Sequence, residues 1–166
     1  MINLIKFKQR KQIMEYNIEN KLKFLNHASY YIESNNAILI CDPWLEGTAF
    51  NNGWALLDQS TNNERTIKEL ISKKKPIFIW YSHEHSDHLA FNFLNELKKN
   101  YNNIKVIFQK TIDKRVLNYL KIKSINVIEA ENGLEYKLDD KFSIYVWKHK
   151  NGDSFSLSII DNISIL

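Results

Sequence analysis

From residue 21 onward, short apolar stretches alternate with polar turns. Residues 21–34 predict two short strands around a turn at Asn26–His27, because polar and apolar positions alternate beside that pair. The turn-forming pair Asn35–Asn36 then leads into an apolar strand, residues 37–43, which is closed by Asp42–Pro43. We therefore expect the domain to open on strands joined by tight turns.

A long loop and a helix follow these strands. Residues 44–63 contain two of the four glycines, and a loop of this length in a compact domain usually carries function. Thr61–Lys75 predicts a helix that is capped by Asn63 and stopped by Pro76, since its apolar residues recur at helical spacing. The same reasoning predicts helices over residues 89–100 and 113–120, and strands over residues 76–81, 104–109 and 125–131.

The pattern changes after Gly133. Residues 135–166 predict antiparallel strands, because polar turn pairs separate short alternating stretches. Alternating strands and helices followed by hairpins predict a layered α/β fold in which sheets pack between helices. The 166 residues suffice for one such domain, which we assign to residues 21–166, with residues 1–20 as an N-terminal extension.

Three of the five histidines lie within six residues, in the string His-Glu-His-Ser-Asp-His at residues 83–88. The string follows an apolar strand and precedes a helix, which is where open α/β sheets bind ligands. In an extended segment His83 and His85 point the same way, so both can bind one metal ion. Asp87 and His88 follow where the chain turns, and we expect them to hold a neighbouring ion. Imidazole and carboxylate groups suit zinc, iron or manganese.

The two remaining histidines are weaker candidates on sequence alone. His149 ends an apolar strand, and His27 lies in the first turn. A single histidine at such a position is more often simply exposed to solvent than part of a site.

Composition changes this picture little. Hydrophobic residues make up 44% and charged residues 25%, as is typical of globular proteins. The net charge of +4 is compatible with nucleic-acid binding, but lysine is spread along the whole chain and arginine is scarce, so we do not expect a nucleic-acid partner. The sequence has one cysteine and neither a membrane-spanning apolar run nor a signal sequence, so we expect a cytoplasmic protein with no membrane contact.

Three segments resemble the metallo-β-lactamase superfamily. The string at residues 83–88 resembles that family's His-x-His-x-Asp-His motif. Leu25–Ser29 resembles its opening turn, with asparagine in place of glycine, and Ile40–Trp44 resembles its Asp-Pro-Trp strand end. The resemblance implies an αββα sandwich that binds one or two divalent metal ions, with His149 as the third histidine ligand of the first ion.

A longer stretch is similar to the metallo-β-lactamase-like domain of the CMP-N-acetylneuraminate hydroxylase family. The similar residues are Asp42–Phe50, Gly53–Trp54, Leu56–Leu57 and Tyr81–Leu89. That family carries a Rieske cluster, which needs two cysteines and two histidines, and this sequence has one cysteine. The superfamily also places a bridging aspartate and a last histidine further along. The resemblance therefore implies a C-terminally incomplete sandwich that self-associates through its edge strand at residues 163–166.

The resemblance implies a metal-dependent hydrolase in which a metal-activated water attacks a small-molecule substrate. Zinc is the first choice of ion and iron the second. The expected metal ligands are His83, His85, Asp87, His88 and His149, and Asp87 is also the expected catalytic residue that orients the water. The surroundings of the metal and substrate are expected to include His27, Asp42, Trp44 and Trp54, although such aromatic residues also commonly fill cores.

The alternative is the metal domain of a CMP-N-acetylneuraminate hydroxylase-like monooxygenase that works with a separate Rieske protein. A nucleotide sugar is then a candidate substrate. Zinc in the purified protein favours hydrolysis, and iron favours oxygenation. A nucleic-acid-processing enzyme and a non-enzymatic remnant of a metal site also stay open.

Overall fold

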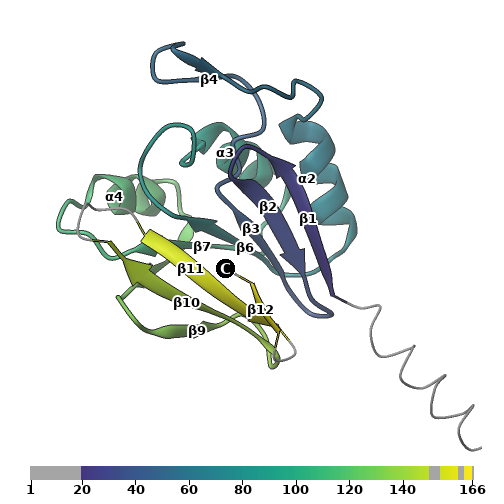
Figure 1. Ribbon diagram of the computed structural model, residues 1–166, viewed down its shortest axis with the longest axis vertical. Helices are drawn as coiled ribbons and strands as arrows, with labels where there is room; N and C mark the ends of the chain where they lie inside the picture. The colour runs from purple at the N-terminus through teal and green to yellow at the C-terminus, as the bar shows by residue number, and fades with distance from the viewer. Residues whose placement is uncertain (1–19, 150–153, 161–162, 166) are drawn as a thin grey trace, which may run out of the picture.

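A six-stranded sheet forms the centre of the computed structural model, which describes residues 20–149, 154–160 and 163–165 (Figure 1). In spatial order its strands are β1 (Lys21–Asn26), β2 (Ser29–Glu33), β3 (Ile38–Cys41), β6 (Ile77–Tyr81), β7 (Ile104–Gln109) and β8 (Asn126–Ala130). The first three strands pair antiparallel, whereas β3, β6, β7 and β8 run parallel. The carboxyl ends of β3 and β6 therefore lie side by side.

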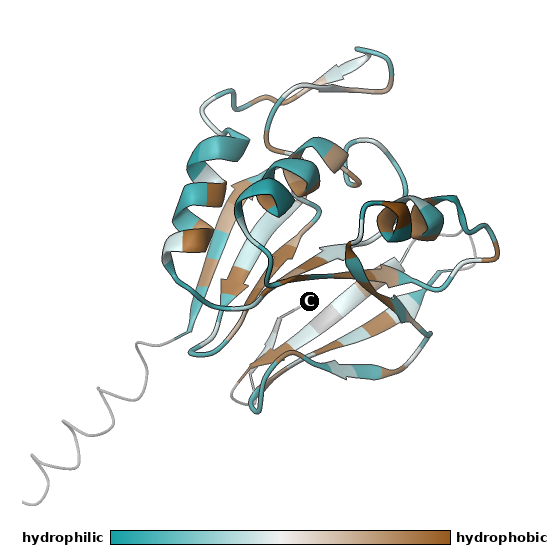
Figure 2. Ribbon diagram, turned by 180° about the vertical axis from the view of Figure 1, so that it is seen from behind, coloured by the Kyte–Doolittle hydropathy of each residue, from teal (hydrophilic) through white to brown (hydrophobic). Residues whose placement is uncertain are grey.

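Helices connect the parallel strands and cover one face of this sheet (Figure 1). They are α2 (Asn63–Ser72), α3 (Phe91–Asn100) and α4 (Arg115–Ile122). Each buries apolar residues at helical spacing, such as Phe93, Leu94 and Leu97 on α3. Figure 2 shows hydrophobic residues along the central strands and a mixture of both kinds on the helices, as expected for amphipathic helices.

A second sheet packs against the other face of the first (Figure 1). In spatial order it contains β12 (Ile163–Ile165), β11 (Ser154–Ile160), β10 (Phe142–Lys148) and β9 (Glu135–Lys137), all antiparallel. The predicted layered α/β fold is confirmed, and the described residues form three of the four layers that an αββα sandwich implies. No helix in the described part of the chain is long and apolar enough to span a membrane.

Strand β6 divides the hydrophobic core into two parts. Ile77, Ile79 and Tyr81 face the helices, while Phe78 and Trp80 face the second sheet. Successive side chains of a strand point to opposite faces, so an entirely apolar strand is needed wherever both faces are covered. The strand that leads into the histidine string is therefore held from both sides.

The first helix is shorter than predicted and has a different cap. The side chain of Asn62 accepts a hydrogen bond from the backbone N–H of Arg65, so Asn62 is the N-cap and the prediction of Asn63 was wrong. Asn63 instead donates through its backbone and its side chain to Glu46, at 3.0 Å each, and is buried. The helix ends at Ser72, before Lys74 adopts a positive φ of 55°.

The other two helices begin later than predicted, each because of a local turn. Residues 85–89 form a tight turn in which the N–H of Leu89 donates to the carbonyl of His85, so α3 starts only at Phe91. The side chain of Asp113 accepts from the backbone N–H of Arg115, which leaves Asp113 outside α4.

The predicted long loop contains a short hairpin, which the sequence pattern did not indicate. Its strands are β4 (Thr48–Ala49) and β5 (Trp54–Ala55), and it extends beyond the end of the central sheet (Figure 1). Of its turn residues, Phe50 has a φ of 50°, and its backbone N–H donates to the Ser86 hydroxyl at 3.0 Å. Residues 1–19, most of the predicted extension, lie outside the described residues.

Candidate metal centre

The candidate ligands gather at one end of the central sheet. The string at residues 83–88 begins just after β6, and Asp42 directly follows the neighbouring strand β3. His27 lies in the turn between β1 and β2, and β2 pairs antiparallel with β3 so that Tyr30 is opposite Cys41. Three separate chain segments therefore meet where ligands of α/β sheets are usually bound.

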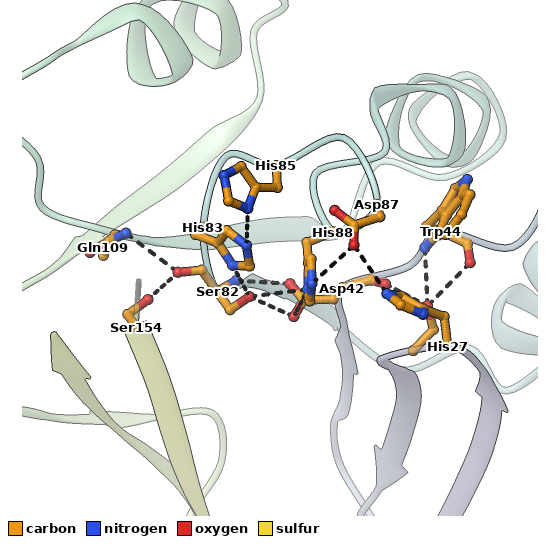
Figure 3. A network of polar contacts seen from close by, with 11 residues as sticks. His27, Asp42, Trp44, Ser82, His83, His85, Asp87, His88, Gln109 and Ser154 are labelled. Atoms are coloured by element: carbon orange, nitrogen blue, oxygen red, sulfur yellow. Dashed lines mark hydrogen bonds and ion pairs between the residues drawn. The ribbon is translucent and has the colours of Figure 1, made fainter. Parts of the chain in front are cut away.

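His83 and His85 form one pair within this centre. The Nε2 atom of His83 lies 2.8 Å from the Nδ1 atom of His85, and the ring centroids are 4.5 Å apart (Figure 3). The other nitrogen of His83, Nδ1, lies 2.9 Å from the Ser82 hydroxyl. Each ring thus turns one nitrogen toward the other, an arrangement that lets both bind a single ion.

His27, Asp87 and His88 form a second group. Within the described part of the chain, they are the set of three potential ligands whose ligand atoms all lie within 4.8 Å of one another. The Oδ2 atom of Asp87 is 3.1 Å from His27 Nε2 and 3.6 Å from His88 Nε2 (Figure 3). Two ligand atoms about 2.1 Å from one tetrahedral ion lie about 3.4 Å apart, so these separations suit coordination.

Asp42 and Ser82 form hydrogen bonds that orient His83 and His88. The carboxylate of Asp42 accepts from the backbone N–H of Ser82 at 2.8 Å, from the Ser82 hydroxyl at 2.7 Å and from His88 Nδ1 at 2.9 Å. A proton on Nδ1 leaves the Nε2 lone pair of His88 facing Asp87. Carboxylates that hold the second nitrogen of a metal-binding histidine in this way are a recurrent part of metal sites.

The backbone at two of these positions is in the left-handed region. His27 has a φ of 46° and Asp42 a φ of 41°. Such values are uncommon outside glycine, although histidine, asparagine and aspartate adopt them more readily than other residues. Strain of this kind persists only where the surroundings enforce it, and it collects at functional sites.

The residues present fit a divalent ion. Asp87 is 5% exposed, and its Oδ1 atom is buried without a hydrogen-bond partner among the described residues. A buried carboxylate oxygen without a partner is costly, and a cation would satisfy it. Because the donors are imidazole nitrogens and carboxylate oxygens, they suit zinc, iron or manganese.

Aromatic residues surround the second group. Trp44 is buried, meets the His27 ring edge-on at 5.3 Å, and packs with Ala49 and Leu56 in a small core of the loop. Trp54 is exposed and lies 6.4 Å from the His27 ring. Trp44 thus supports the loop and His27, whereas Trp54 is open to a substrate.

The group of three potential ligands found among the described residues does not include His149 or Cys41. His149 follows β10 and is exposed. Its role as a ligand stays a prediction. Burial raises the pKa of the Cys41 thiol, which keeps it protonated and unreactive.

Two features of the centre were not expected from the sequence. His27 was expected near the substrate, whereas the structure groups it with potential ligands. The role of Ser82, between Asp42 and two histidines, was missed because it depends on a residue 40 positions earlier. The sequence feature that could have identified Ser82 is its place between an apolar strand and His83.

Two known proteins are similar to part of this chain. The chain is 33% identical over 115 residues to cytidine monophosphate-N-acetylneuraminic acid hydroxylase from Xenopus laevis, covering 66% of this chain and 18% of that protein. The corresponding protein from Danio rerio is 29% identical over 109 residues, covering 66% of this chain and 17% of that protein. The chain therefore spans less than a fifth of these relatives.

A solved structure has the same fold. It is CmlA, a diiron β-hydroxylase from Streptomyces venezuelae, with a TM-score of 0.63 and 13% identity over 88% of this chain and 28% of that one. The model of the β-lactamase superfamily domain matches residues 21–156, which confirms the resemblance drawn from the motifs. The chain belongs to the metallo-β-lactamase superfamily.

Proposed function

We propose that this chain is the metal-binding domain of an iron-dependent hydroxylase that acts on an anionic small molecule, with a nucleotide sugar as the leading candidate. The observation that carries the proposal is the buried, unpartnered Asp87 Oδ1 atom within a convergent group of two histidines and one carboxylate. The choice of hydroxylation is supported by the names of the relatives and of the fold neighbour, which are all hydroxylases.

The chain's own residues would hold and orient the ion. His27, Asp87 and His88 supply one set of ligand atoms, and the pair His83–His85 supplies another. Asp42 would keep the proton of His88 on Nδ1, so that the Nε2 lone pair, 3.6 Å from Asp87, could bind the ion. When bound, iron supplies redox chemistry with dioxygen as the oxidant. The electrons would come from a Rieske centre outside this sequence.

Metal-assisted hydrolysis is the second candidate. The same nitrogen and oxygen donors suit zinc, which needs no electron donor. The Oδ1 atom of Asp87 would then hold and orient the attacking water. The two candidates differ in the metal and not in the arrangement of the protein's side chains.

Metal analysis of the purified protein tests both. Protein produced with iron in large excess over zinc is expected to retain iron, and to lose it in the double variant His83→Ala/His85→Ala and in Asp87→Asn. The matched control is Asp113→Asn, which alters an exposed carboxylate next to α4. Equal metal content in all four proteins would refute the metal centre. Exclusive retention of zinc would refute the hydroxylase and favour the hydrolase.

A further inference from the structure

A groove of about 430 Å³ lies between the histidine string and α4. Its volume is within the range usual for small-molecule sites. His85 lines the groove and also belongs to the pair His83–His85, so the groove borders the candidate metal centre at His85. The opposite side of the groove is formed by residues of α4, which have no role in the candidate metal centre.

Two aromatic rings in contact line the groove, Phe91 at the start of α3 and Tyr119 on α4. The rings of Phe91 and Tyr119 are 4.2 Å apart and tilted by 36°, and the Tyr119 hydroxyl accepts from the side chain of Asn95 at 3.0 Å. Leu89 and Val116 complete the apolar part of the lining. A ligand would therefore meet a preformed surface, and little side-chain ordering would oppose its binding.

One cation faces this surface. The side chain of Arg115, at the start of α4, is 77% exposed. Its Nη2 atom is 3.7 Å from Glu84 across the groove, and its Nε atom is 2.6 Å from Asp113. An ion pair as long and as exposed as that with Glu84 contributes little, so an incoming anion can replace Glu84. The guanidinium group is suited to bind a carboxylate or a phosphate through two parallel hydrogen bonds.

We infer that this groove, the Arg115 groove, is the subsite for the anionic group of the substrate, a phosphate or a carboxylate that Arg115 holds beside His85. The inference rests on the proposed function, because it supposes a small-molecule substrate that reaches the metal centre. It adds the place where the anionic group of the substrate binds and a residue that selects it.

The other hollow beside the centre is less suited to an anion. It has a volume of about 370 Å³ and is lined by His27, Asp42, Ser82 and apolar residues of both sheets. The described residues that line it include the carboxylate of Asp42 but no lysine or arginine, whereas the Arg115 groove sets a guanidinium group against its own carboxylate, Glu84. Arg115 therefore assigns the anion to the α4 side.

Binding of three defined ligands to the purified, metal-loaded chain tests the inference by calorimetry. Cytidine monophosphate carries a phosphate, N-acetylneuraminic acid carries a carboxylate, and cytidine carries neither. We expect Arg115→Ala to weaken binding of one or both anions about tenfold or more and to leave cytidine binding unchanged. The anion whose affinity falls identifies phosphate or carboxylate as the bound group.

Matched variants exclude a general charge effect. Arg65→Ala removes the same charge from the first turn of α2, where Arg65 is exposed, and is expected to bind like the unmodified chain. Glu84→Gln removes the competing carboxylate and is expected to bind the anion more tightly. If Arg115→Ala and Arg65→Ala bind both anions equally well, or if neither anion binds, the inference is wrong.

Metal analysis separates this result from the proposed function. Anion binding that depends on Arg115 in a chain holding zinc alone would uphold the subsite and refute the hydroxylase. Iron retention without Arg115-dependent anion binding would uphold the metal assignment of the hydroxylase and refute the subsite. Arg115 forms its ion pairs with Glu84 and Asp113, which are not candidate metal ligands, so its substitution is not expected to change metal content.

Discussion

Replacing Asp42 by asparagine should weaken metal binding without disturbing the fold. Asparagine tolerates the left-handed backbone at this position about as well as aspartate does, so the φ of 41° can be kept. Its carbonyl oxygen can still accept from the backbone N–H of Ser82. Its amide nitrogen, however, is a donor where the carboxylate accepted from His88 Nδ1 at 2.9 Å.

This exchange forces the His88 proton onto the wrong nitrogen. Two donors cannot share the contact, so the proton moves to Nε2, which faces Asp87 and would have bound the ion. Loss of such an orienting carboxylate costs about 10–100-fold in metal affinity. That range corresponds to about 1.4–2.8 kcal/mol.

A competition titration against a zinc-binding dye measures the effect. The unmodified chain is compared with Asp42→Asn and with Asp139→Asn, whose carboxylate accepts from Ser34 and has no contact with the centre. Thermal unfolding of the metal-free proteins checks that the fold is intact. Equal zinc affinities for all three proteins would refute the orienting role of Asp42.

Three further predictions concern stability. Burial alone would raise the pKa of Glu33, but the ammonium groups of Lys73 and Lys75 outweigh it and lower the pKa. The stabilisation is thus present above the unfolded pKa of about 4.3 and is lost as pH falls through the lower folded value. Glu33→Gln should cost about 1.5–3 kcal/mol in urea unfolding at neutral pH and less in acid; an equal loss at every pH would contradict this. Asn62→Ala should cost about 1 kcal/mol and Asn62→Gly only a few tenths, and equal losses would argue against the cap. Leu94→Ala, in the core under α3, should cost about 2–5 kcal/mol, and a loss near zero would mean that α3 is not packed as described.

Patterns that depend on neighbours in sequence were the ones that could be predicted. The apolar strand before residue 82 and the histidine string after it are local signals, so their position at the end of β6 followed from the sequence. The choice between Asn62 and Asn63 as helix cap could not follow, because either can cap and Asn63 is instead held by Glu46, 17 positions earlier. Arg115 gave no signal, since its neighbour Glu84 is close only in the folded chain.

The hairpin in the long loop also escaped prediction. Strands of two residues have no recognisable period, and Phe50 is held by a hydrogen bond to Ser86, which comes from another segment. Long-range contacts of this kind determine whether such short strands form, whereas longer, fully apolar strands can be recognised from their own sequence.

The two-sided burial of β6 restricts how this protein can vary. Because odd positions face the helices and even positions face the second sheet, adding or deleting one residue in the strand would exchange the two sets. The histidine string follows directly after the strand, so the same change would also shift His83 and His85 relative to Asp42 at the end of β3. The packing of β6 on both faces thus restricts changes in its length and, with them, the position of the candidate ligands.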